Sequence, residues 1–253
     1  MYKLGLKLWS INENYVKEAI RLFEKGIYHY IELFVISGSY DKFINLWKHL
    51  NIPYVIHAPH SYAGLNTAKK EDRNKNLKLI NEILKFANDL NAEIIIFHPG
   101  VEGEIEETAF QLCQINDTRV VVENKPYVGL KDEICNGATI EEIKFVLQKA
   151  KVGFCLDVSH AIISANAQGL EQFSYLKAFN ELRPKIYHLS DGDCKGVYDE
   201  HKNLGKGSYD LKKIVKEVLP KYCCITIETK KKFKDSLSDF EKDVSYLNNL
   251  LKK

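Results

Sequence analysis

The most restrictive feature of this sequence is a strict alternation of strand-like and helix-like segments, repeated eight times. Short apolar runs, typical of buried strands, are each followed by a segment with apolar residues at helical spacing. This order implies parallel strands joined by right-handed crossovers. The eight strands are expected at residues 2–9, 28–35, 52–56, 93–97, 119–122, 153–157, 185–187 and 222–227.

The helical segments carry recognisable start and stop signals. Thr139 with Glu142 three residues later forms a capping-box pattern at the start of one helix. Another helix is expected to begin at Ser208 and to end before Pro220. The segment after the sixth strand is expected to be helical as far as about Phe179.

Eight strand–helix pairs in 253 residues match the size of a closed (β/α)8 TIM barrel. An open doubly wound sheet is the alternative, but it does not naturally use eight consecutive pairs. No linker, low-complexity tract or block of charge divides the chain, so we expect a single α/β domain over residues 1–253. The reacting groups of such a barrel lie at the C-terminal ends of its strands.

Composition and charge narrow the function classes. With a formal net charge of +2, the chain is not strongly basic, whereas many nucleic-acid-binding domains are. The six cysteines include no C-x-x-C pair, which argues against a thiol-based metal or redox motif. No apolar run approaches membrane-spanning length, and the start lacks the apolar core of a signal peptide. We therefore expect a cytoplasmic, monomeric protein with reduced thiols and no membrane contact.

A potential metal ligand stands at the end of each strand from the third to the eighth. With 34 acidic residues and eight histidines in the chain, such a run would arise by chance about once in tens of thousands of trials. Each ligand follows an apolar run, so a rigid strand projects it toward the barrel axis. Cations would neutralise the carboxylates gathered there. The six residues are His57, His98, Glu123, Asp157, His188 and Glu228.

Three further residues extend this pattern. His160 lies one helical turn after Asp157, and the pair is either a metal-ligand pair or a helix N-cap beside a chance histidine. Asp199 and His201 lie in the long loop after the seventh strand, where residues two apart in an extended segment point the same way. Alone, the loop pair would be read as solvent-exposed. Together with the strand-end ligands, it indicates a larger metal site.

These residues occur in motifs that resemble those of the endonuclease IV family. Enzymes of that family are xylose isomerase-like barrels that cut DNA at abasic sites with three zinc ions. The resemblance runs from the third strand to the eighth and fills all nine ligand positions of the family. The motifs are His57-Ala58-Pro59, Phe97-His98-Pro99-Gly100, Val122-Glu123-Asn124, Asp157-Val158-Ser159-His160-Ala161, His188-Leu189-Ser190-Asp191, Asp199-Glu200-His201 and Ile227-Glu228-Thr229.

The resemblance implies a trinuclear site. The first metal would be held by His57, His98 and Glu123. Glu123 would also bridge to a second metal, completed by Asp157, His188 and Glu228. The third would be held by His160, Asp199 and His201.

The resemblance also implies the chemistry and the substrate. A metal-bound hydroxide would attack phosphorus, with Glu123, Asp157 and Glu228 as the catalytic carboxylates. The partner would be DNA that contains abasic sites. Up to three zinc ions are expected, and manganese or iron would also suit imidazole and carboxylate ligands.

The front of the barrel departs from the endonuclease pattern. The segment after the first strand is Trp9–Glu13, where the family has a glycine-rich turn, and the segment Ser37–Tyr40 lacks the family's arginine. The family's tyrosine after the first histidine ligand is replaced by His60, with Tyr62 nearby. His60 is therefore either a substrate contact or a surface loop residue.

A sugar isomerase or epimerase is the alternative function. The strand Tyr30–Phe34 resembles the second strand of such enzymes in the same superfamily, which use one divalent metal. Glu32 would then bind a hydroxyl of a sugar or sugar phosphate, or it is a paired core carboxylate. That single metal would fall to Glu123, Asp157, His188 and Glu228. A third reading is a binding protein that keeps the metals without turnover.

Three consecutive lysines directly follow the last strand-end ligand. Lys230, Lys231 and Lys232 would lie at the face of the barrel that carries the reacting groups. A run of charge is often only solvated. Here it would also be placed to bind phosphates beside the metals.

Overall fold

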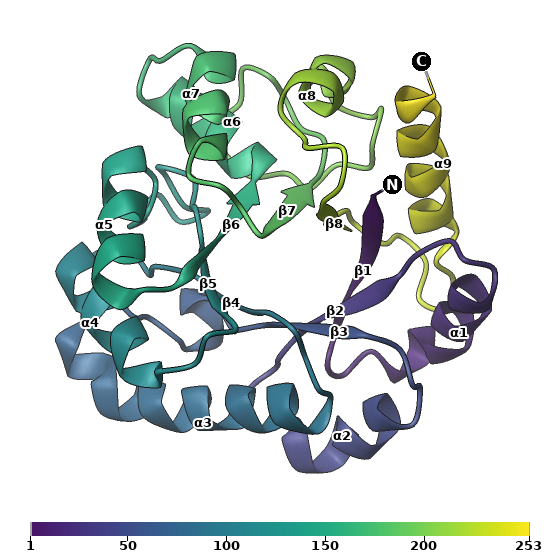
Figure 1. The fold of residues 1–253 in the computed structure, drawn as a ribbon, viewed down its shortest axis with the longest axis horizontal. Coiled ribbons are helices and arrows are strands. Elements are labelled where there is room, and N and C mark those ends of the chain that lie inside the picture. Colours follow the sequence, from purple (N-terminus) through teal and green to yellow (C-terminus); the bar gives the residue numbers. More distant parts are fainter. Residues whose placement is uncertain (1, 253) are drawn as a thin grey trace.

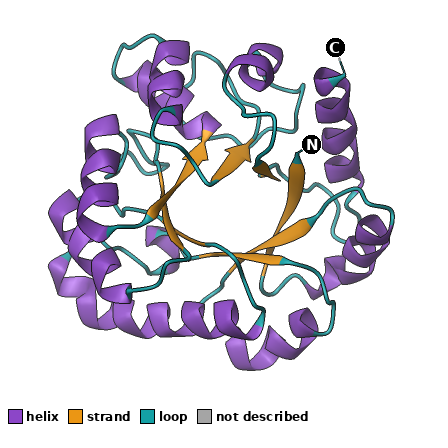
Figure 2. Ribbon diagram, in the orientation of Figure 1, coloured by secondary structure: helices purple, strands orange, loops and turns teal. Residues whose placement is uncertain are grey.

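The computed structural model describes residues 2–252, so the first and last residues of the expected domain lie outside it. Its centre is a closed barrel of parallel strands in the order β1 to β8, with helices around the outside (Figures 1 and 2). Strand β8 pairs directly with β1, with Leu4 opposite Ile225. The predicted TIM barrel is confirmed, and the open-sheet alternative is wrong because the sheet has no free edge.

The strands are short and overlap the segments expected from the sequence. Apolar and β-branched residues fill them, as befits strands that are covered on both faces. Their bounds are β1 Lys3–Trp9, β2 Tyr30–Phe34, β3 Tyr54–His57, β4 Ile95–Phe97, β5 Val120–Glu123, β6 Gly153–Asp157, β7 Ile186–Leu189 and β8 Cys224–Ile227.

Helices follow the strands and form the outer layer of the barrel. The α-helices are α1 Val16–Glu24, α2 Tyr40–Lys48, α3 Arg73–Asp89, α4 Ile105–Ile115, α5 Ile140–Ala150, α6 Val158–Ala167, α7 Gln172–Asn180, α8 Leu211–Glu217 and α9 Ser238–Leu251. Three single turns of 3-10 helix are η1 Glu13–Tyr15, η2 Ser61–Ala63 and η3 Lys70–Asp72. Within the described range, no helix combines the length and apolarity that crossing a bilayer requires.

The segment after β6 forms two helices, which corrects the expectation of a single one. Gly169 has a φ of +69°, a left-handed conformation that ends α6. The Glu171 side chain then accepts hydrogen bonds from the N–H groups of Phe173 and Ser174 and caps α7. A glycine thus ends one helix and a capping residue begins the next, and the helical spacing of apolar residues alone did not predict this break.

Two other expected helix starts can be compared with the structure. Helix α8 begins at Leu211 and not at Ser208, because the Asp210 side chain accepts a hydrogen bond from the Lys213 N–H at 3.0 Å and forms the N-cap. The capping box of Thr139 and Glu142 at the start of α5 is confirmed.

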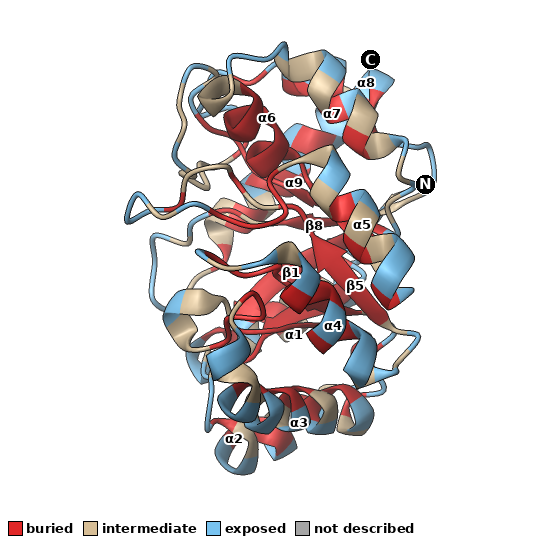
Figure 3. Cartoon of the chain, turned by 90° about the vertical axis from the view of Figure 1, so that its left-hand side faces the viewer, coloured by how far each residue is buried: buried red, intermediate tan, exposed pale blue. Residues whose placement is uncertain are grey.

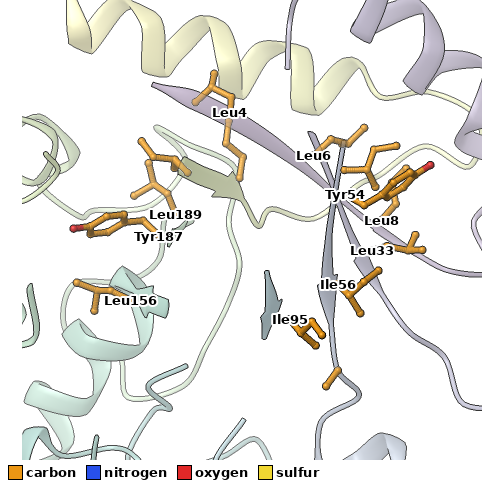
Figure 4. Packing of buried hydrophobic residues seen from close by; sticks show 14 of the residues in the cluster. Leu4, Leu6, Leu8, Leu33, Tyr54, Ile56, Ile95, Leu156, Tyr187 and Leu189 are labelled. Carbon is orange, nitrogen blue, oxygen red and sulfur yellow. The ribbon is translucent and has the colours of Figure 1, made fainter. Parts of the chain in front are cut away.

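Two apolar layers hold the barrel together. The larger fills the space between strands and helices and includes Leu4, Leu6 and Leu8 of β1 (Figure 4). The strands are accordingly buried along most of their length, most helices are buried on one face, and α6 is buried nearly all round (Figure 3). The smaller layer lies apart from it and consists of Tyr30, Val55, Ile96, Val121, Cys155 and Ile186. The first layer fixes the helices on the strands, and the second forms a floor for the residues that follow it.

Candidate metal centre

Each of the eight strands has one polar residue, within the strand or directly after it, in a layer above the small apolar cluster. Each such residue lies two positions after an inward-facing residue, as the period of two in a strand requires. For example, Glu123 follows Val121 and Asp157 follows Cys155, both members of the small cluster. The layer consists of Lys7, Glu32, His57, His98, Glu123, Asp157, His188 and Glu228. The sequence pattern predicted the six from β3 to β8 as metal ligands, which stays a prediction, and gave no sign of Lys7.

The first group in this layer is His57, His98 and Glu123, whose ligand atoms all lie within 4.8 Å of one another. The Nε2 atoms of His57 and His98 lie 3.1 and 3.2 Å from Glu123 Oε2. The other ring nitrogen of His57, Nδ1, lies 2.8 Å from the Ala58 carbonyl. Because a carbonyl only accepts, Nδ1 carries a hydrogen, and Nε2 is the nitrogen that would bind a cation beside Glu123.

The second group is Glu123, Asp157, His188 and Glu228, again with ligand atoms within 4.8 Å. Asp157 Oδ2 is buried without a hydrogen-bond partner, and His188 Nδ1 and Glu228 Oε2, 2.9 Å apart, form no hydrogen bond of good geometry. Buried polar atoms without partners are costly and uncommon. Oxygen and nitrogen atoms that converge in this way fit a divalent metal, which would satisfy all of them.

Asp157 serves two purposes at once. Its Oδ1 accepts a hydrogen bond from the His160 N–H at 2.7 Å and caps α6, while Oδ2 faces the second group. Asn124 fixes its backbone, since the Asn124 side chain donates to the Asp157 carbonyl at 3.0 Å and accepts from the Asp157 N–H at 2.8 Å. The N-cap and the metal-ligand interpretations of the sequence are therefore compatible.

The third group is His160, Asp199 and His201. Asp199 Oδ2 lies 3.3 Å from His160 Nε2 and 2.6 Å from His201 Nε2. The Nδ1 atoms of the two histidines are held by backbone carbonyls, that of Asn124 at 2.8 Å and that of Glu228 at 2.9 Å. Nε2 of each ring is thus turned toward Asp199, as Nε2 of His57 is turned toward Glu123.

The loop that carries Asp199 and His201 is not the extended segment expected from the sequence. His201 has a φ of +47°, in the left-handed region that non-glycine residues rarely adopt. The Lys230 N–H stabilises this conformation by donating to the His201 carbonyl at 3.1 Å. The side chains of Asp199 and His201 still point to the same place, as their spacing of two predicted, although the backbone at His201 is not extended.

Burial and mutual charge shift the pKa values of these groups. Burial, together with the charges of Glu123, Asp199 and Glu228, raises the pKa of Asp157 to about 6. Burial by itself would lower the pKa of His201, but the charges of Asp199 and Glu228 outweigh it and raise that pKa to about 9. Without a cation, protons on histidines therefore balance part of the carboxylate charge.

The cavity above the polar layer is small and leads into a larger groove. The cavity of about 130 Å³ is lined by members of all three groups and by Lys125 and Leu130. The groove of about 650 Å³ continues from it past Trp9. The lysine run lies along this groove, with Lys230, Lys231 and Lys232 among its lining residues. Burial lowers the pKa of Lys231 to about 8.

The remaining residues proposed to touch a substrate occupy different positions. His60 is half-buried in the wall of the cavity, its ring centroid 5.4 Å from that of Phe34, so it is not a surface residue. Tyr62 is 44% exposed at the rim of the cavity and donates a hydrogen bond to Glu133. Glu32 is fully buried and contacts His188 and Lys7. These contacts are those of a paired core carboxylate, and a contact between Glu32 and a sugar hydroxyl stays a prediction.

Relatives of known sequence align with most of this chain. The uncharacterized protein MJ1614 of Methanocaldococcus jannaschii is 22% identical over 266 residues, which cover 99% of this chain and 100% of that protein. A probable endonuclease 4 of Aquifex aeolicus is 28% identical over 190 residues, which cover 67% of this chain and 66% of that protein.

Solved structures share the fold along nearly the whole chain. Endonuclease IV from Thermus thermophilus superposes with a TM-score of 0.70 at 19% identity and covers 99% of both chains. A D-tagatose 3-epimerase-like protein superposes equally well, with a TM-score of 0.70 at 18% identity over 99% of this chain and 97% of the other. The family model described as xylose isomerase-like TIM barrel matches residues 20–250. This chain therefore belongs to the xylose isomerase-like TIM barrel family.

Proposed function

We propose that this protein is a metal-dependent phosphodiester hydrolase of endonuclease IV type, which cleaves DNA on the 5′ side of abasic sites with up to three zinc ions. The observation that carries the proposal is the third group, His160, Asp199 and His201, built beside the other two. A single-metal isomerase needs only the second group. In each histidine of the third group, as in His57, Nδ1 contacts a backbone carbonyl and Nε2 is turned toward a carboxylate, an orientation that prepares the ring for metal binding.

The position of each residue indicates its role in the proposed reaction. Bound metal ions would lower the pKa of a coordinated water and stabilise negative charge on phosphoryl oxygens. Glu123 joins the first two groups through its two oxygens. Lys230–Lys232 would hold the flanking phosphates in the groove. Leu130 lines both the cavity and the groove and would limit water near the reacting phosphorus.

A sugar isomerase or epimerase with one metal is the second candidate. The small volume of the cavity favours it, since about 130 Å³ admits a small molecule or the reacting group of a larger one. The second group alone would supply its metal ligands. A single-metal isomerase would not use the third group, and for this reason it is the second candidate.

Parallel assays distinguish the two candidates. Metal-loaded protein should nick a duplex at an abasic site on the 5′ side, without a borohydride-trappable intermediate, because no lysine acts as nucleophile. It should not interconvert a panel of ketoses and sugar phosphates. Sugar turnover without nicking would reject the hydrolase and favour the isomerase.

Binding to DNA should depend steeply on salt, chiefly through the lysine run. Changing Lys230, Lys231 and Lys232 to glutamine should flatten the slope of log K against log salt by about 0.9 for each phosphate that the variant no longer neutralises. The measurement is fluorescence anisotropy of an abasic duplex at several salt concentrations. The matched control changes Lys25, Lys151 and Lys185, exposed residues that precede β2, β6 and β7 at the opposite end of the barrel. Equal slopes for both triple variants would show that the groove does not hold the DNA.

A further inference from the structure

Lys7 of β1 is a buried lysine in the polar layer. Its exposed fraction is 7%, and its Nζ lies 2.6 Å from Glu228 Oε1 and 3.2 Å from Glu32 Oε1. An ammonium group this far from water needs counter-charge close by, and these two carboxylates supply it. The contact with Glu228 exists because β8 closes the barrel against β1.

Both carboxylates that contact Lys7 also contact His188, from opposite sides of its ring. His188 Nε2 donates to Glu32 Oε2 at 2.9 Å, and Nδ1 lies 2.9 Å from Glu228 Oε2. Each carboxylate thus uses one oxygen for Lys7 and the other for His188. Thr226 adds a second donor to Glu32 Oε2, at 2.6 Å. The result is a closed ring of contacts through Lys7, Glu228, His188 and Glu32.

We propose that Lys7 is a positioning residue for metal binding by the second group. It holds Glu228 Oε1, so that Glu228 Oε2 faces the group. It also holds Glu32, which keeps Nε2 of His188 occupied and turns Nδ1 toward the same place. One lysine therefore orients two of the four residues of this group. The inference rests on the metal site of the proposed function and does not require DNA as the substrate.

Whether removal of Lys7 weakens or strengthens metal binding distinguishes a positioning role from a simple charge effect. A fixed ammonium group repels a divalent cation, so a lysine that acted only through its charge would weaken metal binding. Its removal would then strengthen binding. A lysine that orients ligands has the opposite effect, since loss of residues that orient metal ligands typically lowers affinity by about 10–100-fold.

The test measures Co²⁺ binding by Lys7→Met with two methods, calorimetry and the visible absorption of the bound ion. Lys3→Met is the matched control, because Lys3 lies on the same strand with an exposed side chain. We expect Lys7→Met to bind about 10–100-fold more weakly at one class of site, with an altered Co²⁺ spectrum. The remaining sites and the control should match the wild type. Unchanged or tighter binding at every site would overturn the proposal.

Two additions keep this test decisive. Lys7→Gln retains an N–H donor and is measured in parallel, so the comparison stands if Lys7→Met does not fold. Wild-type protein that binds Co²⁺ but leaves abasic DNA intact would reject the proposed function and leave the role of Lys7 standing. Wild-type protein that binds no Co²⁺ would overturn both.

Discussion

Glu123→Gln should remove most of the bound metal and lower the rate of hydrolysis by about 10³-fold or more, since one carboxylate serves two groups. Its Oε2 lies 3.1 and 3.2 Å from the Nε2 atoms of His57 and His98, and its Oε1 lies 3.4 Å from His188 Nδ1. Glutamine has the same shape but no charge, and its amide nitrogen cannot bind a cation. Both groups would therefore be without their shared anionic ligand.

Elemental analysis after dialysis provides the measurement. The wild type should retain more than one zinc equivalent and up to three, whereas Glu123→Gln should retain no more than one. Glu133→Gln is the matched control, because Glu133 also lines the cavity but contacts Tyr62 and not a member of the three groups. Equal metal content in Glu123→Gln and the wild type would contradict the shared-ligand arrangement.

Asp157→Asn should abolish activity and yet stabilise the metal-free protein at neutral pH. Loss of a charged ligand should cost several kcal/mol of transition-state stabilisation, about 10³-fold or more in rate. The folded-state pKa of Asp157 is about 6, above its ordinary value of 3.8. The unfolded chain thus ionises this group more readily, so the stability that the neutral carboxyl contributes is lost as pH rises from about 4 to about 6.

Asparagine avoids this penalty because it does not ionise, and its Oδ1 can still accept the capping hydrogen bond from His160. The gain for the chelator-treated variant should be about 1–3 kcal/mol at pH 7.5 and close to zero at pH 4. Denaturant unfolding at the two pH values measures it. Cys155→Ser, on the same strand, should leave the catalytic rate largely intact. Equal losses of rate in the two variants would mean that both act through folding, or that Asp157 is not a ligand.

Much of the candidate site was predictable because its residues have local sequence signals. The run Val120–Glu123 reads as a strand that ends in a carboxylate, and the same pattern of a ligand type at a strand end recurs at His57 and Asp157. Side chains alternate between the two faces of a strand, so the position of a residue in the strand fixes whether it faces the barrel interior. A histidine or a carboxylate at a strand end is therefore informative on its own. Six of these strand ends, together with the loop pair Asp199 and His201, pointed to one site before any contact was known.

The sequence by itself determined the alternation of elements, the closed barrel and the types of residue at its mouth, because each depends on short-range periodicity. Only the tertiary structure decided how these residues are paired. Lys7 reads in the sequence as an ordinary strand lysine, and it becomes part of the site because closure of the barrel brings β8 beside β1. The left-handed turn at His201 likewise depends on a contact with Lys230, far away in the chain. Long-range contacts of this kind produce no periodic pattern in the sequence, so the sequence specified the residue types at the barrel mouth and the fold specified their contacts.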